Sequence, residues 1–357
     1  MTEAKVAPAK VVIVGEHIIP ANPWRNKFVQ RQYQIALEWA RQEHLKKYPK
    51  STVELRFSFD EGPHQSFKKA QLEEAFGVAG YLYSSDALEA AHVAKKEGIP
   101  YMSPVSPLKG ITNDFSHSLA ANHDDLKKAL ECLKKDFNHP SIILAPRTAL
   151  TNFEFNRIYQ ETFQVLASLR GQALKMWGKL EALLKEHTKK GKVNILLGGY
   201  AFEQMDLVVF LNKSPFRERI NFIANPQWNY NPTNLSINLT SEVNNFYVFS
   251  DYFEPLADES KDLYQKLSGK ISKEPLVEGR SINEPIVYAL ADMMSIAFKL
   301  AEESQSKEDY MKRMSNYKQK GILGQYVIKD HQSQRKVYLG KWTGKKIERI
   351  KELSVNT

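Results

Sequence analysis

Apolar positions near the start of the chain change their spacing in a regular order. Val11–Val14 form a short β-branched run, typical of a buried strand, and the Asn22-Pro23 pair after it is suited to begin a helix. Apolar side chains then recur at helical spacing over residues 28–40. The spacing becomes two over residues 53–59, as in a half-buried strand, and residues 64–76 return to a helical pattern. The sequence therefore predicts an α/β fold.

The next segment has the pattern of a complete strand–helix–strand unit. Residues 77–83 form an apolar run without charge, and Ser84, Ser85 and Asp86 can cap a helix over residues 86–97. Gly98 and Pro100 are suited to end that helix before a strand at residues 101–104.

The alternation continues along most of the chain. It predicts a helix at 123–136, a strand at 142–145, a helix near 152–168, a strand at 193–197, a helix from about 200, a strand at 246–249 and a helix at 283–303. Strands that alternate with helices at this spacing favour parallel, doubly wound sheets. About ten strands exceed one ordinary domain, so we expect two sheets.

The end of the chain has a different pattern. Residues 324–328 and 335–339 are strand-like and are separated by the polar segment 329–334. They predict a terminal antiparallel hairpin.

Composition and charge exclude several functional classes. With 357 residues, of which 42% are hydrophobic and 25% charged, the chain can form two packed lobes. No apolar stretch approaches the roughly 20 residues that a membrane-spanning helix needs. The net charge of +9 comes from lysine pairs spread along predicted helices, as on solvated helix faces, so we expect no nucleic acid partner. The single cysteine, Cys132, forms no intramolecular disulfide and is expected to be a small buried residue.

Catalytic and metal-binding signatures are absent from the sequence. There is no GxSxG, GxxxxGK[ST], HExxH or CxxC pattern, so we expect neither an enzyme nor a cofactor or metal site. The two closest histidines, His117 and His123, are expected at the surface.

Three loops remain as candidates because open α/β sheets bind ligands at the carboxyl ends of their strands. They are residues 20–24, 83–85 and 103–107. Serines at a helix N-terminus leave backbone donors that suit a carboxylate or a phosphate. Three residues of these loops also have a purely structural interpretation: Ser84 and Ser85 could cap the following helix, and Trp24 could pack in the core.

The order and spacing of four segments resemble the type I periplasmic-binding-protein family, within it the receptors for branched-chain amino acids. The resemblance runs from about Lys10 to Ile350, and the segments are PWRNKFVQRQYQIALEWA, GYLYSSDALEAAHVAKKEGIPYMSPVSPLKGIT, ILLGGY and GQYVIKDHQSQRKVYL. It implies two lobes, each a mainly parallel doubly wound sheet, joined by a hinge of three crossovers. Lobe one would comprise residues 1–120 plus 252–320 and lobe two residues 121–251 plus 321–357, with a ligand cleft between them.

The resemblance also implies a set of ligand-binding residues. They are Trp24, Tyr83, Ser84, Ser85, Val105, Ser106, Phe153, Tyr200 and Gln227. Two of the matched positions depart from the amino-acid receptors, because Pro107 replaces a common Thr and Gln227 replaces the acidic partner of the ligand ammonium. A neutral Gln cannot offset the charge of a buried ammonium group. A neutral, aromatic or anionic ligand therefore fits these residues at least as well as an amino acid does. Trp228 could add to an aromatic lining.

The family function is capture of a small molecule by hinge closure and its delivery to an ABC permease in the inner membrane. We therefore expect a periplasmic, monomeric solute-binding protein. The opening MTEAKVAPAK is too polar for a signal peptide, so either the export signal precedes this numbering or the protein is cytoplasmic. The alternative function is a ligand sensor of the same fold that signals to a regulator. A repressor is disfavoured because the first strand, near residue 11, leaves no room for a helix-turn-helix module.

Overall fold

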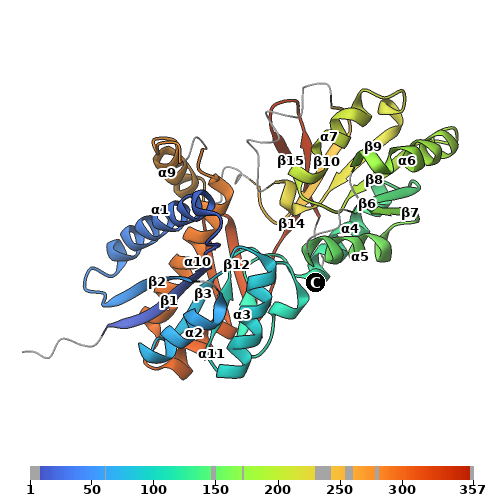
Figure 1. Cartoon of the computed structure of the whole chain (residues 1–357). Coiled ribbons are helices and arrows are strands. Elements are labelled where there is room, and N and C mark those ends of the chain that lie inside the picture. The colour runs from blue at the N-terminus through green and yellow to red at the C-terminus, as the bar shows by residue number, and fades with distance from the viewer. Residues whose placement is uncertain are drawn as a thin grey trace, which may run out of the picture. The chain divides into compact units, whose positions relative to one another are not determined.

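The computed structural model describes residues 9–60, 62–145, 150–170, 173–229, 243–253, 260–277 and 281–353. The chain forms two compact units, of which unit 1 comprises residues 1–122 and 255–335 and unit 2 comprises residues 123–254 and 336–357 (Figure 1). The chain therefore crosses between the units three times.

Unit 1 is built on a five-stranded parallel sheet in the order β2-β1-β3-β4-β5. The strands are β1 (Lys10–His17), β2 (Val53–Asp60), β3 (Gly77–Gly80), β4 (Tyr101–Ser103) and β5 (Ser116–Ser118). The helices are α1 (Pro23–Lys47), α2 (Pro63–Leu72), α3 (Ser84–Glu97), α9 (Lys261–Ile271), α10 (Glu284–Glu303) and α11 (Lys307–Ser315), with a short 3-10 turn η1 (Lys109–Ile111). Helix α1 packs along α10 and α2 packs along α3, and both α2 and α10 contact the strands. The predicted doubly wound sheet is confirmed.

Unit 2 repeats this parallel order and extends it. Its sheet runs β15-β14-β10-β9-β8-β6-β7, so its five parallel strands, numbered by chain order within the unit, are again arranged 2-1-3-4-5. They are β6 (Ser141–Ala145), β7 (Val165–Arg170), β8 (Val193–Leu197), β9 (Ile220–Ala224) and β10 (Phe246–Ser250). Antiparallel β14 (Val337–Trp342) and β15 (Ile347–Leu353) follow β10. The helical segments are α4 (His123–Asp136), α5 (Leu150–Thr162), α6 (Ala173–His187) and α7 (Ala201–Asn212), with 3-10 turns η2 (Arg217–Arg219) and η3 (Pro226–Trp228).

Local signals in the sequence account for several helix ends. The Asn22 side chain accepts a hydrogen bond from the Arg25 amide and caps α1, as the Asn22-Pro23 pair predicts. Helix α3 ends at Gly98 in the left-handed conformation, with φ of 66°.

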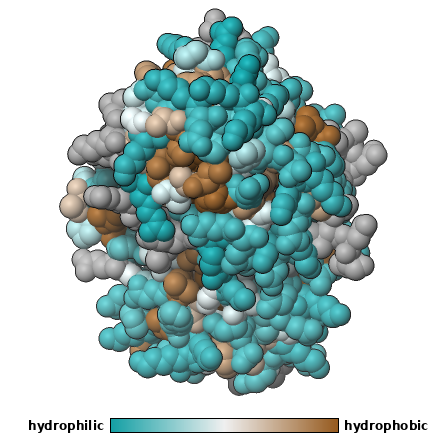
Figure 2. All heavy atoms as spheres, turned by 90° about the vertical axis from the view of Figure 1, so that its right-hand side faces the viewer, coloured by the Kyte–Doolittle hydropathy of each residue, from teal (hydrophilic) through white to brown (hydrophobic). Residues whose placement is uncertain are grey.

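In the view of Figure 2 the surface is mostly hydrophilic, and the hydrophobic residues gather in separate groups, because the apolar stripes of the helices face the sheets.

Some expected elements are wrong. The helix expected near 152–168 ends at Thr162, and residues 165–170 form strand β7 instead. Helix α6 and strand β9 were not predicted from the pattern. Cys132, expected to be buried, is half-buried.

The predicted terminal hairpin is also wrong, since its two segments belong to different units. Strand β12 (Gly324–Lys329) pairs with β11 (Tyr317–Gly321) and β13 (Gln332–Ser333) in a small sheet of unit 1. Strand β14, by contrast, joins the sheet of unit 2. The third crossing therefore follows Arg335 rather than residue 321.

Polar contacts to α10 hold this small sheet on unit 1. The buried carboxylate of Asp292 accepts hydrogen bonds from the amides of Ile322 (2.6 Å) and Leu323 (2.8 Å) and from the Tyr326 hydroxyl (2.9 Å). The Arg335 guanidinium donates to the Leu323 carbonyl at 2.9 Å. Charge-assisted bonds of this kind are stronger than neutral ones, and no feature of the apolar pattern reveals them.

Both histidines expected at the surface are buried, so that expectation is wrong. His117 is fully buried in β5, with Nε2 3.1 Å from the Tyr317 hydroxyl and its ring near His331. His123 is paired with Glu154.

Within the described ranges, no helix is long and apolar enough to cross a membrane.

The close approach of the neighbouring parallel strands β1 and β3 at Gly15 and Gly80 gives the first prediction. Gly80 has φ of 132°, and a Cβ at that position would overlap the carbonyl oxygen of Gly15 on the neighbouring strand. Gly80→Ala should destabilise the protein by more than about 3 kcal/mol, measured by urea unfolding. Gly178→Ala is the control, because it lies in α6 with nothing within 4 Å of its Cβ and should be neutral or stabilising by up to about 1 kcal/mol. Equal effects of the two variants would contradict this interpretation.

A second prediction concerns pH. Burial, with a smaller effect of the nearby His331, lowers the pKa of His117 to about 3. Between pH 6.5 and 3 the unfolded chain therefore binds a proton that the folded chain does not, and the free energy of unfolding falls as the pH falls. The contribution of His117 is about 1.4 kcal/mol per pH unit. We expect His117→Gln to show a shallower loss of stability over pH 6 to 4 than the parent protein, and an unchanged slope would show that His117 is not the group responsible.

Candidate functional site

Each parallel sheet reverses its strand order at one point, and ligands of doubly wound folds bind at the carboxyl ends of the strands there. In unit 1 this point lies between β1 and β3, and in unit 2 between β6 and β8. We call residues 16–26 and 81–86 the unit 1 edge, and residues 198–200 and 225–228 the unit 2 edge.

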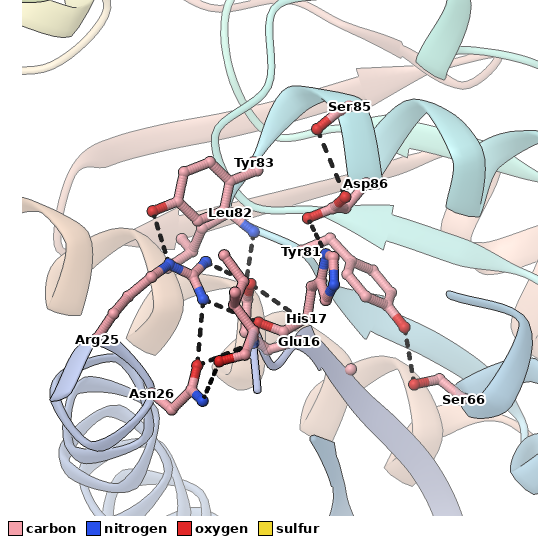
Figure 3. Close-up of polar contacts among 12 residues, drawn as sticks. Glu16, His17, Arg25, Asn26, Ser66, Tyr81, Leu82, Tyr83, Ser85 and Asp86 are labelled. Atoms are coloured by element: carbon pink, nitrogen blue, oxygen red, sulfur yellow. Dashed lines mark hydrogen bonds and ion pairs between the residues drawn. The ribbon is translucent and has the colours of Figure 1, made fainter. Parts of the chain in front are cut away.

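The backbone of the unit 1 edge has an unusual conformation. Tyr81, which follows Gly80, has φ of 62°, in the left-handed region that a bulky residue seldom adopts. Its hydroxyl donates to Ser66 at 2.8 Å and its ring is fully buried, so the fold holds it in place. Strain that the surroundings enforce in this way is common at functional sites. Here it turns the chain so that the next amide, of Leu82, points at Glu16 (Figure 3).

Glu16 is the central acceptor of this edge. It is 1% exposed and ends the apolar run of β1. Its carboxylate accepts hydrogen bonds from the Tyr33 hydroxyl (2.6 Å), the Leu82 amide (2.9 Å) and the His17 amide (3.1 Å). Burial raises the pKa of Glu16, and the bonds from Tyr33 and Leu82 oppose this rise.

Arg25 lies beside this carboxylate. Its side chain is 9% exposed, and its Nη2 is 3.9 Å from Glu16 Oε1. Nε donates to the Tyr83 hydroxyl at 3.1 Å and Nη1 donates to the His17 carbonyl at 3.1 Å (Figure 3). The guanidinium carbon lies 4.5 Å from the centroid of the Tyr83 ring, within cation–π distance.

Further polar groups surround the start of α3. His17 Nδ1 is 3.2 Å from Asp86 in the first turn of the helix. The Ser106 hydroxyl donates to that of Ser84 at 2.9 Å, which links the loop after β4 to the same helix.

The candidate residues of unit 1 lie at the carboxyl edge of its sheet. Their structural roles differ from the helix capping and core packing considered for Ser84, Ser85 and Trp24. Helix α3 begins at Ser84, with Tyr83 as its N-cap, and no side chain caps it. Trp24 and Tyr83 are 41% and 44% exposed, so neither is a core residue. Ser85 is exposed, Ser84 and Val105 are half-buried, and Ser106 is buried.

The unit 2 edge is rich in amides and contains Tyr200. The Tyr200 amide donates to Glu203 at 2.9 Å at the start of α7, and its side chain is half-buried. Asn225 donates to the carbonyls of Leu197 and Gly199, both at 3.0 Å, and so ties the loops after β8 and β9 together.

Trp228 is a core residue and does not line a ligand site in unit 2. It is fully buried, and its indole nitrogen donates to the Gly199 carbonyl at 2.9 Å. The suggestion that it lines an aromatic cleft is therefore wrong. Phe153 lies in α5, and its side chain falls outside the described residues.

Two buried amide oxygens in unit 2 have no hydrogen-bond partner in the part of the chain that the structure describes. They are Oε1 of the half-buried Gln227 and Oδ1 of Asn156, which abuts Gly198. Unsatisfied buried acceptors are unfavourable, so either oxygen could accept a bond from a donor group of a ligand.

Glu16 and Arg25 were not among the candidate residues predicted from the sequence, and Asp86 was named only as a possible helix cap. Glu16 did carry a signal, because it is a charged residue directly after a buried apolar strand, where charge needs a partner. Arg25 carried none, because a cation in the first turn of an amphipathic helix looks like a surface residue. Among the described residues, no three His, Cys, Asp or Glu side chains are grouped so as to hold a metal ion.

No protein-family model matches this chain, and no curated protein matches it in sequence. Solved structures do match in fold. A substrate-binding protein of an ABC transporter from Desulfitobacterium hafniense, in complex with Leu, has a TM-score of 0.73 at 13% identity, over 96% of this chain and 100% of that one. LivJ from Streptococcus pneumoniae, a branched-chain amino acid transporter substrate-binding protein in complex with isoleucine, has a TM-score of 0.72 at 13% identity and the same coverage.

A third match binds an aromatic acid. It is a solute-binding protein of an ABC transporter from R. palustris in complex with 4-hydroxybenzoate, with a TM-score of 0.71 at 13% identity over 97% of both chains. The likeness to all three extends over nearly the whole chain, so both units share their fold.

The charge on Glu16 generates a prediction about stability. Tyr33→Phe removes a donor to a carboxylate, whereas Tyr159→Phe removes one to the neutral carbonyl of Ile223, at 3.2 Å. Both rings are fully buried, so the apolar contribution is matched. We expect losses of about 2 kcal/mol for Tyr33→Phe and about 1 kcal/mol for Tyr159→Phe in urea unfolding. A larger loss for Tyr159→Phe would contradict the central role given to Glu16.

Proposed function

We propose that this chain, whose fold is that of the type I periplasmic binding proteins, captures a small organic acid and delivers it to an ABC importer. The observation that carries the proposal is the unit 1 edge. A strained turn, a nine-tenths buried arginine and two large, partly exposed aromatic side chains gather at the point of the sheet where such folds bind ligands.

The chemistry of the ligand is supported by two considerations. The matched structures hold leucine, isoleucine and 4-hydroxybenzoate, all of which contain a carboxylate. In this chain Trp24 and Tyr83 offer apolar surface, and Ser84 and Ser85 offer hydroxyls at a helix start. A carboxylic acid with an apolar or aromatic body fits these groups.

Capture is proposed to involve both units. Tyr200 and Gln227 of the unit 2 edge would contact the same ligand, and the three crossings of the chain between the units would act as the hinge. A ligand that contacts both units stabilises the closed form by its differential affinity for it. The loaded form would then dock, as a monomer in the periplasm, on a membrane permease. No step of this proposal requires catalysis.

Ligand screening by thermal shift tests this function. We expect the melting temperature to rise saturably with at least one member of a panel of amino acids and aromatic acids, because a ligand bound only by the folded state stabilises it. Trp24→Ala should weaken the effect at least tenfold in ligand concentration. Leu72→Ala is the control, since Leu72 is an exposed apolar residue of unit 1 outside the edge.

Two outcomes of the thermal-shift screen would contradict parts of the proposal. A shift that survives Trp24→Ala unchanged would contradict the assignment of the unit 1 edge. No shift with any acid would contradict the proposed ligand class.

A further inference from the structure

The hydrogen bonds of Arg25 leave part of its guanidinium unused. The group has five N–H donors, and in a side chain that is 9% exposed each of them needs an acceptor. Nε and Nη1 donate to the Tyr83 hydroxyl and the His17 carbonyl, and Nη1 is also 3.5 Å from Asn26 Oδ1. Nη2 lies 3.9 Å from Glu16 Oε1, beyond hydrogen-bond distance, and donates no hydrogen bond to any of the described residues.

Three hydrogen bonds hold the Glu16 carboxylate in its place beside Arg25. Oε2 accepts from Tyr33 and Leu82, and Oε1 accepts from the His17 amide. The carboxylate is therefore fixed by the sheet and by α1. It offsets the charge of Arg25 without taking up its Nη2 donors.

Tyr83 adds a second donor at the same place. Its hydroxyl oxygen accepts from Arg25 Nε, so its own hydrogen points to another acceptor. No described side chain provides that acceptor at hydrogen-bond distance, and Tyr83 is 44% exposed. Arg25 Nη2 and the Tyr83 hydroxyl thus form two neighbouring donors, one of them charged, at the rim of the edge (Figure 3).

We propose that Arg25 and Tyr83 are the anchor for the carboxylate of the ligand, and that this anchor makes the protein selective for acids over their neutral amides. One carboxylate oxygen accepts from Arg25 Nη2 and the other from the Tyr83 hydroxyl. Bonds from a cation to an anion in a partly buried site are strong, and an amide would place an N–H group against these donors. The inference rests on the proposed function and specifies the residues that select the ligand.

Matched acid and amide pairs test the anchor. Isothermal titration calorimetry at pH 7 would compare 4-hydroxybenzoate with 4-hydroxybenzamide and leucine with leucinamide. For the parent protein we expect at least one acid to bind at least tenfold more tightly than its amide. Arg25→Gln should weaken binding of that acid at least tenfold and change binding of the amide by less than threefold.

Two further variants serve as controls. Arg31→Gln removes a cation from the same helix that is paired with Glu274 outside the edge, and it should leave both affinities unchanged. Tyr83→Phe removes only the hydroxyl of a partly exposed ring, so it should fold normally and weaken acid binding at least threefold. If Arg25→Gln does not fold, the binding of acid and amide by Tyr83→Phe therefore tests the anchor on its own.

The outcomes separate the two proposals. Equal binding of acid and amide by the parent protein, or equal losses of both in Arg25→Gln and Tyr83→Phe, would overturn the anchor while leaving the solute-binding function in place. Failure of the parent protein to bind either acid or either amide would contradict the proposed function for these solutes and the anchor with it.

Discussion

The unit 1 edge depends on one buried negative charge. Glu16 ends a strand of hydrophobic residues, and its carboxylate is stable there only because backbone amides, a tyrosine and an arginine converge on it. The Leu82 amide reaches it because Gly80 and Tyr81 adopt left-handed conformations where β3 passes close to β1. The loop after β3 and the Arg25 side chain therefore both lie against a single acceptor.

The two units share a strand order but differ in the chemistry at their edges. Unit 1 presents charged and hydroxyl groups, namely Glu16, Arg25, Asp86 and Tyr83. Unit 2 presents amides, including that of Gln227, whose Oε1 has no hydrogen-bond partner among the described residues. Under the proposed function, the first edge would hold an anionic group and the second would accept from a neutral donor. Gln227 carries no charge to balance an ammonium, which favours acids without one, such as hydroxybenzoates, over amino acids.

Strands and helices could be predicted largely from the sequence because they depend on local periodicity, whereas the two-lobed fold was expected from the resemblance of four segments to a known family. The helix at 123–136 and the strand at 193–197 have the expected bounds, since apolar spacing and terminal residues determine both. The terminal hairpin failed for a physical reason. Residues 324–328 and 335–339 each have a strand pattern, but the partner of each is chosen by distant contacts, such as those of Asp292 with Ile322 and Leu323.

The candidate site was predictable only in part. Trp24, Tyr83 and Ser84 were predicted as candidates because they lie at the ends of loops that follow parallel strands. Arg25 was not found, because its role follows from burial against Glu16 and Tyr83, which come from two other segments of the chain. Burial of a charge depends on tertiary packing, and no spacing along α1 reports it.

Amide hydrogen exchange with and without a saturating acid would show whether one small acid engages the carboxyl edges of both sheets, as proposed. We expect slower exchange at Leu82–Asp86 in unit 1 and at Gly199–Ala201 in unit 2, with exchange in helices α6 and α11 unchanged. Slower exchange in only one of these segments, or uniformly across the chain, would contradict this proposal.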